Sequence, residues 1–267
     1  MAKQQRDIQK IVKIGCCGFA TAQEKYAKLF GVIEVQQTFY QPPTLATLQR
    51  WRATFPAEFE FSLKAWQLIT HEARSSTYRR LKLELTQQER QECGFFRDSP
   101  IIRKAWETTY NCALALEANL ILFQCPVSFK PTEQNLERMR AFFGTINRNG
   151  LQLLWEPRGN WPSQLVLQLC QELKLIYVVD PFVKTSTITF PYPAPNPHLN
   201  YYRLHGGKDY RHNFDDDELK SLLDLIYPDT MTYFMFNNVN MLENAQRFQA
   251  LLLEKETSQA SVPLTGS

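Results

Sequence analysis

The chain has 267 residues, of which 44% are hydrophobic and 13% aromatic, together with 10 Gly and 15 Pro. This composition supports a sizeable core and excludes a low-complexity chain. Lys and Arg outnumber Asp and Glu by only 30 to 27, which gives no sign of a strongly basic surface for nucleic acid.

We expect neither a targeting segment nor a disulfide framework in this chain. Residues 1–10 form a polar N-terminal segment, and no apolar run approaches the roughly 20 residues that span a bilayer. We therefore expect no membrane contact and a cytoplasmic location. The six cysteines include no CxxC pair, so free thiols are expected rather than a disulfide framework or a zinc site. Residues 257–267 are small and polar and are expected to form a disordered tail.

Short apolar runs rich in β-branched residues recur along the whole chain. They predict strands at residues 11–17, 32–36, 59–65, 120–125, 151–155, 175–179, 201–205 and 232–236. Several of them, such as 175–179, are almost continuously apolar. This is typical of parallel strands covered on both faces by helices.

Helical patterns with recognisable end signals lie between these runs. Thr44 is expected to cap a helix that ends before Pro56, Ser99-Pro100 to open a second, and Asp215 to open a third. A final helix carries Phe248. Strand and helix alternating about eight times predict an α/β fold, a single-domain (β/α)8 TIM barrel over residues 11–256, with an open doubly wound sheet as the alternative.

The connection between the third and fourth strands is longer than the others. Residues 66–118 contain two helical stretches, 72–91 and 100–118, and so predict a helical insertion. Two interpretations are open: the insertion covers the mouth of the barrel as a lid, or it adds packing helices without a role in the site.

Polar side chains interrupt or follow nearly every apolar strand at its carboxyl end. Because these ends converge on one rim of a parallel barrel, the sequence predicts a polar pocket there. A charge within an apolar strand costs several kcal/mol unless it is paired or solvated. The alternative is that Glu34, Lys64, Glu156 and Arg203 form structural ion pairs that fill the barrel. The expected rim residues are Glu34, Lys64, Gln124, Glu156, Arg158, Asp180, Arg203, His205, Asn237 and Asn238.

Both charge signs occur in this set, which favours acid–base chemistry on a small phosphorylated or carboxylated ligand. We expect Glu156 or Glu34 to act as general acid or base and His205 to relay a proton. Lys64, Arg158 and Arg203 would hold the anion. Such a site suits a hydrolase, an isomerase or a lyase. Further ligand contacts are expected from Gln124, Asp180, Asn237, Asn238, Tyr40 and Gly206, the last because Gly206-Gly207 follow the seventh strand, where many barrels bind phosphate.

Two other functions stay open at this point. A metal-dependent phosphoesterase would use Glu34, Glu156, Asp180 and His205 as ligands for Mg²⁺, Mn²⁺ or Zn²⁺, but the neighbouring cations disfavour a metal. A noncatalytic protein that binds nucleotide or nucleic acid would use Arg203, Lys64 and the rim aromatics, and is also disfavoured. Those aromatics are Phe39, Tyr40, Trp66, Trp155, Trp161 and Tyr210. Two histidines, His71 and His212, lie beyond strand ends and are expected to be ordinary polar loop residues.

Several short motifs together resemble the YecE-like family, also called domain of unknown function 72. They occur in a fixed order between about residue 13 and residue 253. The motifs are KIGCCGF at residues 13–19, IEVQQTFY at 33–40, FSLKA at 61–65, LFQCP at 122–126, WEPR at 155–158, YRLHG at 202–206 and FNN at 236–238.

The resemblance implies a TIM barrel and no settled activity. It places the family's acidic residue of the second strand on Glu34, its Lys on Lys64, its Glu and Arg after the fifth strand on Glu156 and Arg158, and its Arg and His on Arg203 and His205. Two motifs depart from the family pattern. Residues 16–19 read Cys-Cys-Gly-Phe where many members have Thr-Ser-Gly-Trp, and residues 156–158 read Glu-Pro-Arg where many have Glu-Phe-Arg.

Overall fold

Eight parallel strands close into a barrel in the computed structural model, which describes residues 8–183 and 198–260. Each strand pairs with the next along the chain, and the last pairs with the first, so that Val12 lies opposite Thr232. The strands are β1 (Val12–Cys17), β2 (Val32–Val35), β3 (Glu60–Lys64), β4 (Leu120–Gln124), β5 (Gln152–Glu156), β6 (Ile176–Val179), β7 (Leu199–Leu204) and β8 (Met231–Phe236). The predicted TIM barrel and all eight predicted strands are confirmed.

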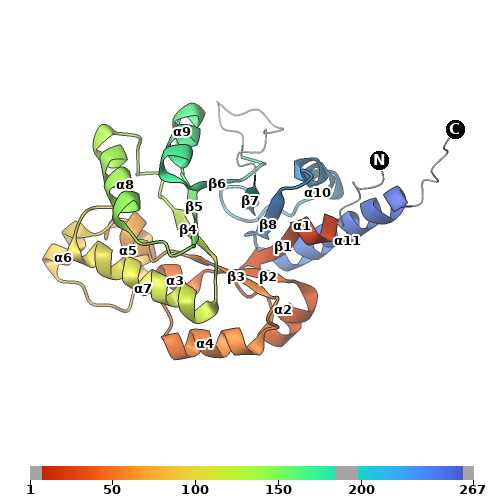
Figure 1. Cartoon of the computed structure of the whole chain (residues 1–267), viewed down its shortest axis with the longest axis horizontal. Coiled ribbons are helices and arrows are strands. Elements are labelled where there is room, and N and C mark those ends of the chain that lie inside the picture. Colours follow the sequence, from red (N-terminus) through yellow and green to blue (C-terminus); the bar gives the residue numbers. More distant parts are fainter. Residues whose placement is uncertain (1–7, 184–197, 261–267) are drawn as a thin grey trace.

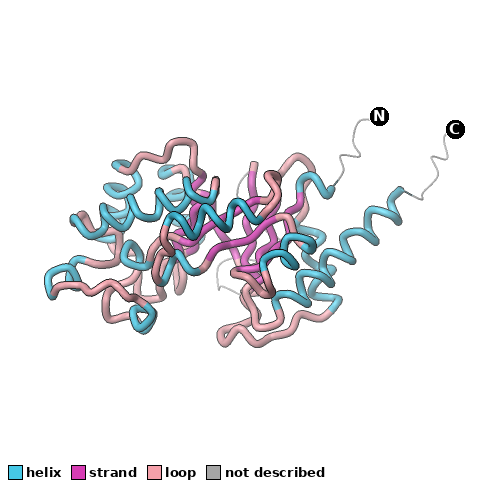
Figure 2. Tube along the Cα trace, turned by 90° about the horizontal axis from the view of Figure 1, so that it is seen from below, coloured by secondary structure: helices cyan, strands magenta, loops and turns pink. Residues whose placement is uncertain are grey.

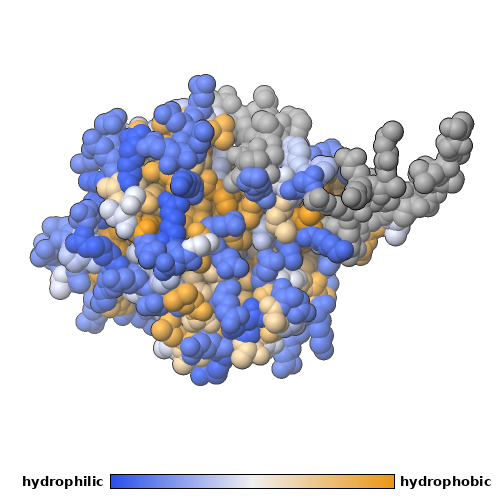
Figure 3. All heavy atoms as spheres, in the orientation of Figure 1, coloured by the Kyte–Doolittle hydropathy of each residue, from blue (hydrophilic) through white to orange (hydrophobic). Residues whose placement is uncertain are grey.

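Helices surround the strands, as the cartoon and the tube trace show (Figures 1 and 2). A short helix α1 (Ile8–Ile11) leads into β1, and the longer outer helices are α2 (Gln23–Leu29), α4 (Leu45–Thr54), α7 (Pro100–Leu116), α8 (Glu133–Thr145), α9 (Ser163–Leu173), α10 (Asp216–Ser221) and α11 (Met241–Ala260). Their outward surfaces are mainly hydrophilic on the face seen in Figure 3. No helix among residues 8–183 and 198–260 is long and apolar enough to cross a membrane.

The predicted helix starts are set by side-chain caps. The Thr44 hydroxyl accepts a hydrogen bond from the backbone N–H of Thr47, and Ser99 accepts one from Ile102. Asp215 and Glu218 form a reciprocal capping box at α10. Each cap satisfies a backbone N–H that has no partner within the helix. The third helix is shorter than its apolar pattern suggested, because the backbone tightens into a 3₁₀ turn, η2 (Leu222–Leu225), directly after α10.

The connection from β3 to β4 differs in detail from the predicted pair of helices. The expected stretch 72–91 is not one continuous helix: it contains η1 (Ser76–Arg80) and most of α6 (Gln87–Glu92), separated by irregular backbone, with α5 (Gln67–Thr70) before them. The second stretch is α7, which packs against α4 and α5. The N–H of Gly94 donates to the Leu68 carbonyl and that of Phe96 to the Ile69 carbonyl, so this part of the connection is hydrogen-bonded to α5.

The two ends of the predicted domain lie close to the limits of the described residues. Helix α11 continues to Ala260, beyond the expected end of the barrel at residue 256. Residues 1–7 and 261–267, and with them most of the polar N-terminal segment and of the expected tail, lie outside the described residues. The same is true of the proline-rich segment 191–197.

Candidate functional site

Alternation along each strand decides which polar side chains reach the barrel interior. Buried apolar residues inside the barrel form a cluster separate from the one beneath the helices, and its members repeat every second residue, as in Leu120 and Leu122 of β4. The next residues in this phase are polar. They are Glu34 in β2 and Gln36 after it, Lys64 at the end of β3, Gln124 at the end of β4, Glu156 at the end of β5 and Arg158 after it, Asp180 after β6, and Arg203 in β7 with His205 after it.

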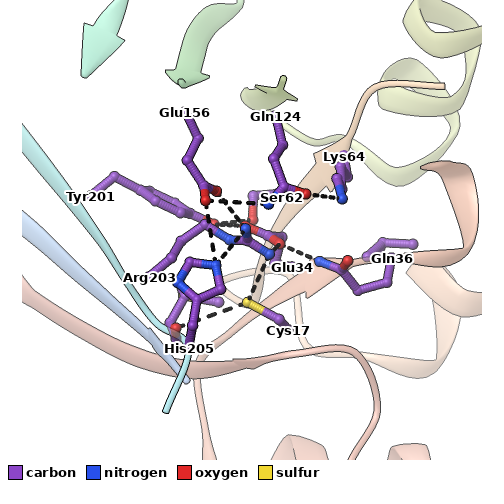
Figure 4. A network of polar contacts seen from close by, with 12 residues as sticks. Cys17, Glu34, Gln36, Ser62, Lys64, Gln124, Glu156, Tyr201, Arg203 and His205 are labelled. Atoms are coloured by element: carbon purple, nitrogen blue, oxygen red, sulfur yellow. Dashed lines mark hydrogen bonds and ion pairs between the residues drawn. The ribbon is translucent and has the colours of Figure 1, made fainter. Parts of the chain in front are cut away.

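Arg203 lies at the centre of the polar network drawn in Figure 4. Its side chain is 1% exposed, and its guanidinium joins two buried carboxylates. Nη1 donates to Glu156 Oε2 at 2.5 Å and Nη2 donates to Glu34 Oε1 at 2.9 Å. The other oxygen of Glu34 accepts from the Tyr201 hydroxyl at 2.9 Å, and Gln36 also donates to Oε1. Both carboxylates are therefore occupied by neighbours within the protein.

The charges in this network stabilise one another. Burial alone would raise the pKa of the Glu156 carboxyl, but Arg158, Arg203 and His205 outweigh it and hold that pKa well below its usual range. Burial likewise opposes the charge on Arg203, and Glu34 and Glu156 overcome it, so the pKa of the guanidinium is raised. Glu156 thus stays ionised while it contacts Arg158 Nε at 2.6 Å.

His205 is held as a neutral imidazole with its proton on Nδ1. Two guanidinium groups approach Nε2, Arg158 Nη2 at 2.6 Å and Arg203 Nη1 at 3.1 Å, and both can only donate. Nε2 must therefore accept, and Nδ1–H donates to Asp180 Oδ2 at 2.9 Å. Burial and the two arginines lower the pKa of His205, against the opposing effect of Glu156 and Asp180. Glu156 Oε1 also lies 3.4 Å from Nε2, farther away than either guanidinium.

An open cavity of about 480 Å³ lies at the carboxyl ends of the strands. Three basic side chains line it, and no Asp or Glu is among its described lining residues. This volume falls within the range typical of small-molecule sites. Its lining consists of Gln36, Phe39, Tyr40, Lys64, His71, Thr77, Gln124, Cys125, Pro126, Val127, Arg158, Arg203, Tyr210 and Asn237.

Lys64 differs from the two arginines of the cavity lining because no described carboxylate is paired with its charge. Its ammonium donates to Gln124 Oε1 and lies 3.6 Å from the centre of the Phe39 ring. No carboxylate of the described residues forms an ion pair with it. Burial is the main effect that lowers the pKa of Lys64, to about 7, and the Arg203 charge lowers it further. The amine therefore gains or loses its proton close to neutral pH.

The cavity brings together six of the predicted site residues and leaves the others behind its wall. Lys64, Gln124, Arg158, Arg203, Tyr40 and Asn237 line it. Glu34, Glu156, His205 and Asp180 lie in the network that holds the arginines. Gly206 lies in the turn after β7, and Asn238 follows β8 and packs against that turn; neither is among the lining residues.

Gly206 and Asn238 both have structural roles where the turn after β7 packs against the segment after β8. Gly206 has φ +65°, and a Cβ there would lie 2.7 Å from the Cβ of Asn238 and 2.8 Å from the carbonyl oxygen of His212. Asn238 donates to that carbonyl at 2.9 Å and to Asn244 at 2.7 Å. These contacts pack the turn against α11, and neither Gly206 nor Asn238 is part of the cavity lining.

Several lining residues had no clear signal in the sequence. His71 was expected to be an ordinary loop residue, but it is buried, lines the cavity and packs its ring 5.0 Å from that of Phe39. Thr77 comes from the β3–β4 connection, as does Arg80, which covers the ring of Tyr40 at 3.5 Å. Gln36 could have been found, because it follows Glu34 by two residues and so shares its face.

Half of the predicted rim aromatics belong to the core instead. Trp66, Trp155 and Trp161 are buried and line no part of the cavity. The indole of Trp155 donates to Cys125 Sγ at 3.4 Å, and that of Trp161 donates to the Phe129 carbonyl at 3.1 Å. These tryptophans pack between the barrel and its helices, where the largest apolar side chains stabilise the fold most.

The oxygen and nitrogen atoms considered as metal ligands do not form a metal site. No group of three His, Cys, Asp or Glu side chains within the described ranges is placed to hold a metal ion. The space between Glu34 and Glu156 is filled by the guanidinium of Arg203, with which both are ion-paired. A cation there would have to displace a buried arginine.

A family model described as "protein of unknown function DUF72" matches residues 20–265 of the chain. The chain belongs to the DUF72 family. This confirms the resemblance inferred from the strand-end motifs. No curated protein matches the sequence.

Solved structures of DUF72 proteins share the fold. A DUF72 family protein from Enterococcus faecalis has 20% sequence identity and a TM-score of 0.67, over 91% of this chain and 98% of that one. One from Thermotoga maritima has 19% identity and a TM-score of 0.63, over 91% and 99%. A D-psicose 3-epimerase crystallised in the presence of D-fructose has 13% identity and a TM-score of 0.55, over 90% and 97%. At these identities the likeness establishes the TIM-barrel fold.

Proposed function

We propose that this DUF72 protein is an enzyme that binds a small anionic ligand in the cavity at the strand ends and acts on it by acid–base chemistry. The observation that carries the proposal is the charge of the cavity wall. Lys64, Arg158 and Arg203 line the cavity, and no carboxylate does so among the described lining residues. A phosphate or a carboxylate is the ligand that such a wall attracts.

Arg158 is the residue best placed to bind the anion directly. Its Nε contacts Glu156 and its Nη2 contacts His205, which fixes the plane of the guanidinium. Its Nη1 has no hydrogen-bond partner among the described residues. Lys64 uses one N–H on Gln124 and has two left. Free donors on two cations of one cavity supply the charge-assisted hydrogen bonds that an anion requires.

The buried carboxylates and His205 support the arginines in this proposal. Glu34 and Glu156 accept hydrogen bonds from Arg203, and the Asp180–His205 pair orients the same guanidinium groups from the other side. For either glutamate to act as the general base, it would have to exchange an arginine for the ligand. Lys64 lines the cavity and changes its protonation near neutral pH, so the geometry favours it as the acid–base group.

The wall is less suited to stacking of bases. Lys64 covers the Phe39 ring and Arg80 covers the Tyr40 ring. A base that stacked on either ring would have to displace a cation from its face. A small anion needs no such displacement, so we place the nucleotide or nucleic-acid alternative second.

Calorimetric titration tests anion binding. Inorganic phosphate and phosphorylated or carboxylated metabolites are titrated into the wild type, into Arg158→Met and into Arg140→Met. The last variant is the control, because Arg140 pairs with Glu172 between the outer helices α8 and α9. We expect Arg158→Met to weaken binding about 10- to 100-fold, as for a lost hydrogen bond to a charged group, and Arg140→Met to leave it unchanged. Failure of the whole panel to bind the wild type, or equal binding by Arg158→Met, would contradict the proposal.

A further inference from the structure

Lys64 differs from an ordinary structural lysine in its surroundings. Its side chain is 5% exposed, yet it lines an open cavity at the end of β3. Its contacts are an amide oxygen and the face of an aromatic ring rather than a carboxylate. Lys13 offers a contrast within the same barrel, since its ammonium pairs with Glu60 at 2.9 Å and its side chain is 25% exposed. A buried amine without a carboxylate partner is an uncommon arrangement.

The charged groups around Lys64 come from β2, from the end of β5 and from β7, and they do not neutralise it. Arg203 and Arg158 disfavour its positive charge, and Glu156 and Glu34 favour it, but both glutamates are ion-paired with arginines. His71 also faces it, from the segment after α5, and burial with the nearby Lys64 and Arg158 charges lowers the pKa of that imidazole to about 3. His71 is therefore neutral at physiological pH.

These surroundings give Lys64 the properties of a nucleophile. At pH 7 about half of the Lys64 side chains carry no proton, against roughly one in three thousand for a lysine with a pKa of 10.5. Only the neutral amine has a lone pair that attacks carbon. Lys64 lines the cavity in which the proposed anion binds, and Arg158, which lines the same cavity, offers a donor to the anionic group.

We propose that Lys64 forms an imine with its ligand, which assigns the ligand to anions that also carry an aldehyde or ketone. This rests on the proposed anion site, with Arg158 holding the phosphate or carboxylate and Lys64 meeting the carbonyl carbon. The amine lone pair forms the C–N bond while the carbonyl π electrons move to oxygen. The two amine protons then leave with that oxygen as water, and a C=N bond remains.

Reductive trapping tests this directly on the unmodified protein. The wild type is incubated with glyceraldehyde 3-phosphate or with pyruvate and then treated with borohydride, which delivers hydride to a C=N bond and leaves a stable secondary amine. Peptide mass spectrometry locates the label. We expect label on Lys64 to exceed that on Lys13 by at least about tenfold at pH 7, and its rate to rise between pH 6 and 8 and then level off. Phosphate added in excess should compete.

Two outcomes would overturn the imine. One is label confined to lysines other than Lys64, and the other is a labelling rate at Lys64 that keeps rising toward pH 10. Lys64→Met removes the amine at nearly the same side-chain length and is the matched control, while the wild-type peptide map does not depend on that variant folding. If phosphate binds by calorimetry but Lys64 stays unlabelled, the imine fails and the anion site stands. If phosphate does not bind at all, the proposed function fails as well.

Discussion

Replacing Lys64 with methionine should change how the stability of the protein depends on pH. The folded chain holds the Lys64 proton only below about pH 7, whereas an unfolded lysine holds it up to about 10.5. Between these values the unfolded state binds the extra proton, so this group makes the free energy of unfolding rise with pH. From pH 6 to pH 9 the rise amounts to about 3 kcal/mol for the wild type relative to the variant.

Urea denaturation at pH 6 and at pH 9 measures this difference. Unfolding free energies of the wild type and of Lys64→Met are compared at each pH, so that the titration of other groups cancels. Lys13→Met is the matched control, because it removes a strand lysine that pairs with Glu60 away from the cavity. If the difference between wild type and Lys64→Met changes by less than about 1 kcal/mol between the two pH values, the pKa of Lys64 is not lowered as its burial requires.

Three further outcomes follow from the network behind the cavity. Arg203→Met leaves two buried carboxylates without their common partner and should lower the free energy of unfolding by about 3–5 kcal/mol in urea titrations; a loss below about 1 kcal/mol would show that the pairs are not formed. A nitrogen-15 NMR titration should find that His205 keeps its last proton on Nδ1 and becomes an imidazolium only at a lower pH than an unperturbed histidine does, since burial lowers its pKa; a midpoint at or above that of a free histidine would contradict the two-arginine contact. Gly206→Ala should cost about 1–3 kcal/mol in thermal or urea unfolding because φ is positive and the Cβ would clash, whereas unchanged stability would refute the packing described for this turn.

The fold follows from patterns that act locally. Apolar runs of strand length, separated by capped helices, already specify which segments are strands, and eight of them in a βα order have few arrangements available. The capping residues Thr44, Ser99 and Asp215 mark helix starts in sequence and do so in the structure. The β3–β4 connection was predicted less well, because its backbone is held by contacts such as Gly94 N–H to the Leu68 carbonyl, which no local pattern reveals.

The positions of the candidate site residues could be predicted from the sequence, but their pairing partners could not. Convergence of strand ends brings Lys64, Arg158 and Arg203 together, as their positions in sequence indicated. Which charges face the cavity depends on pairing across the barrel, and this cannot be derived from one strand at a time. Arg203 meets Glu34 from β2 and Glu156 from β5, so the structural ion-pair interpretation describes these three residues well.

Lys64 does not fit the structural ion-pair interpretation, because it forms no ion pair with a described carboxylate. His71 does not fit the prediction of an ordinary loop residue, because it lines the cavity. Both pack against the ring of Phe39, and both face the cavity. Lys64 escapes pairing because the nearby glutamates are already occupied. His71 reaches the cavity because the segment after α5 folds back over the strand ends, with the Tyr78 hydroxyl donating to the His71 carbonyl at 2.7 Å. Neither outcome is visible in residue type or spacing.

In the proposed function, the cavity at the strand ends holds an anion between Lys64 and Arg158. Crystals soaked in selenate at pH 6, where Lys64 is mostly protonated, would locate such an anion by the anomalous signal of selenium. We predict a peak within hydrogen-bonding distance of Arg158 Nη1 and Lys64 Nζ that is absent from Arg158→Met crystals. Selenate bound at other surfaces while this cavity holds none would contradict the account.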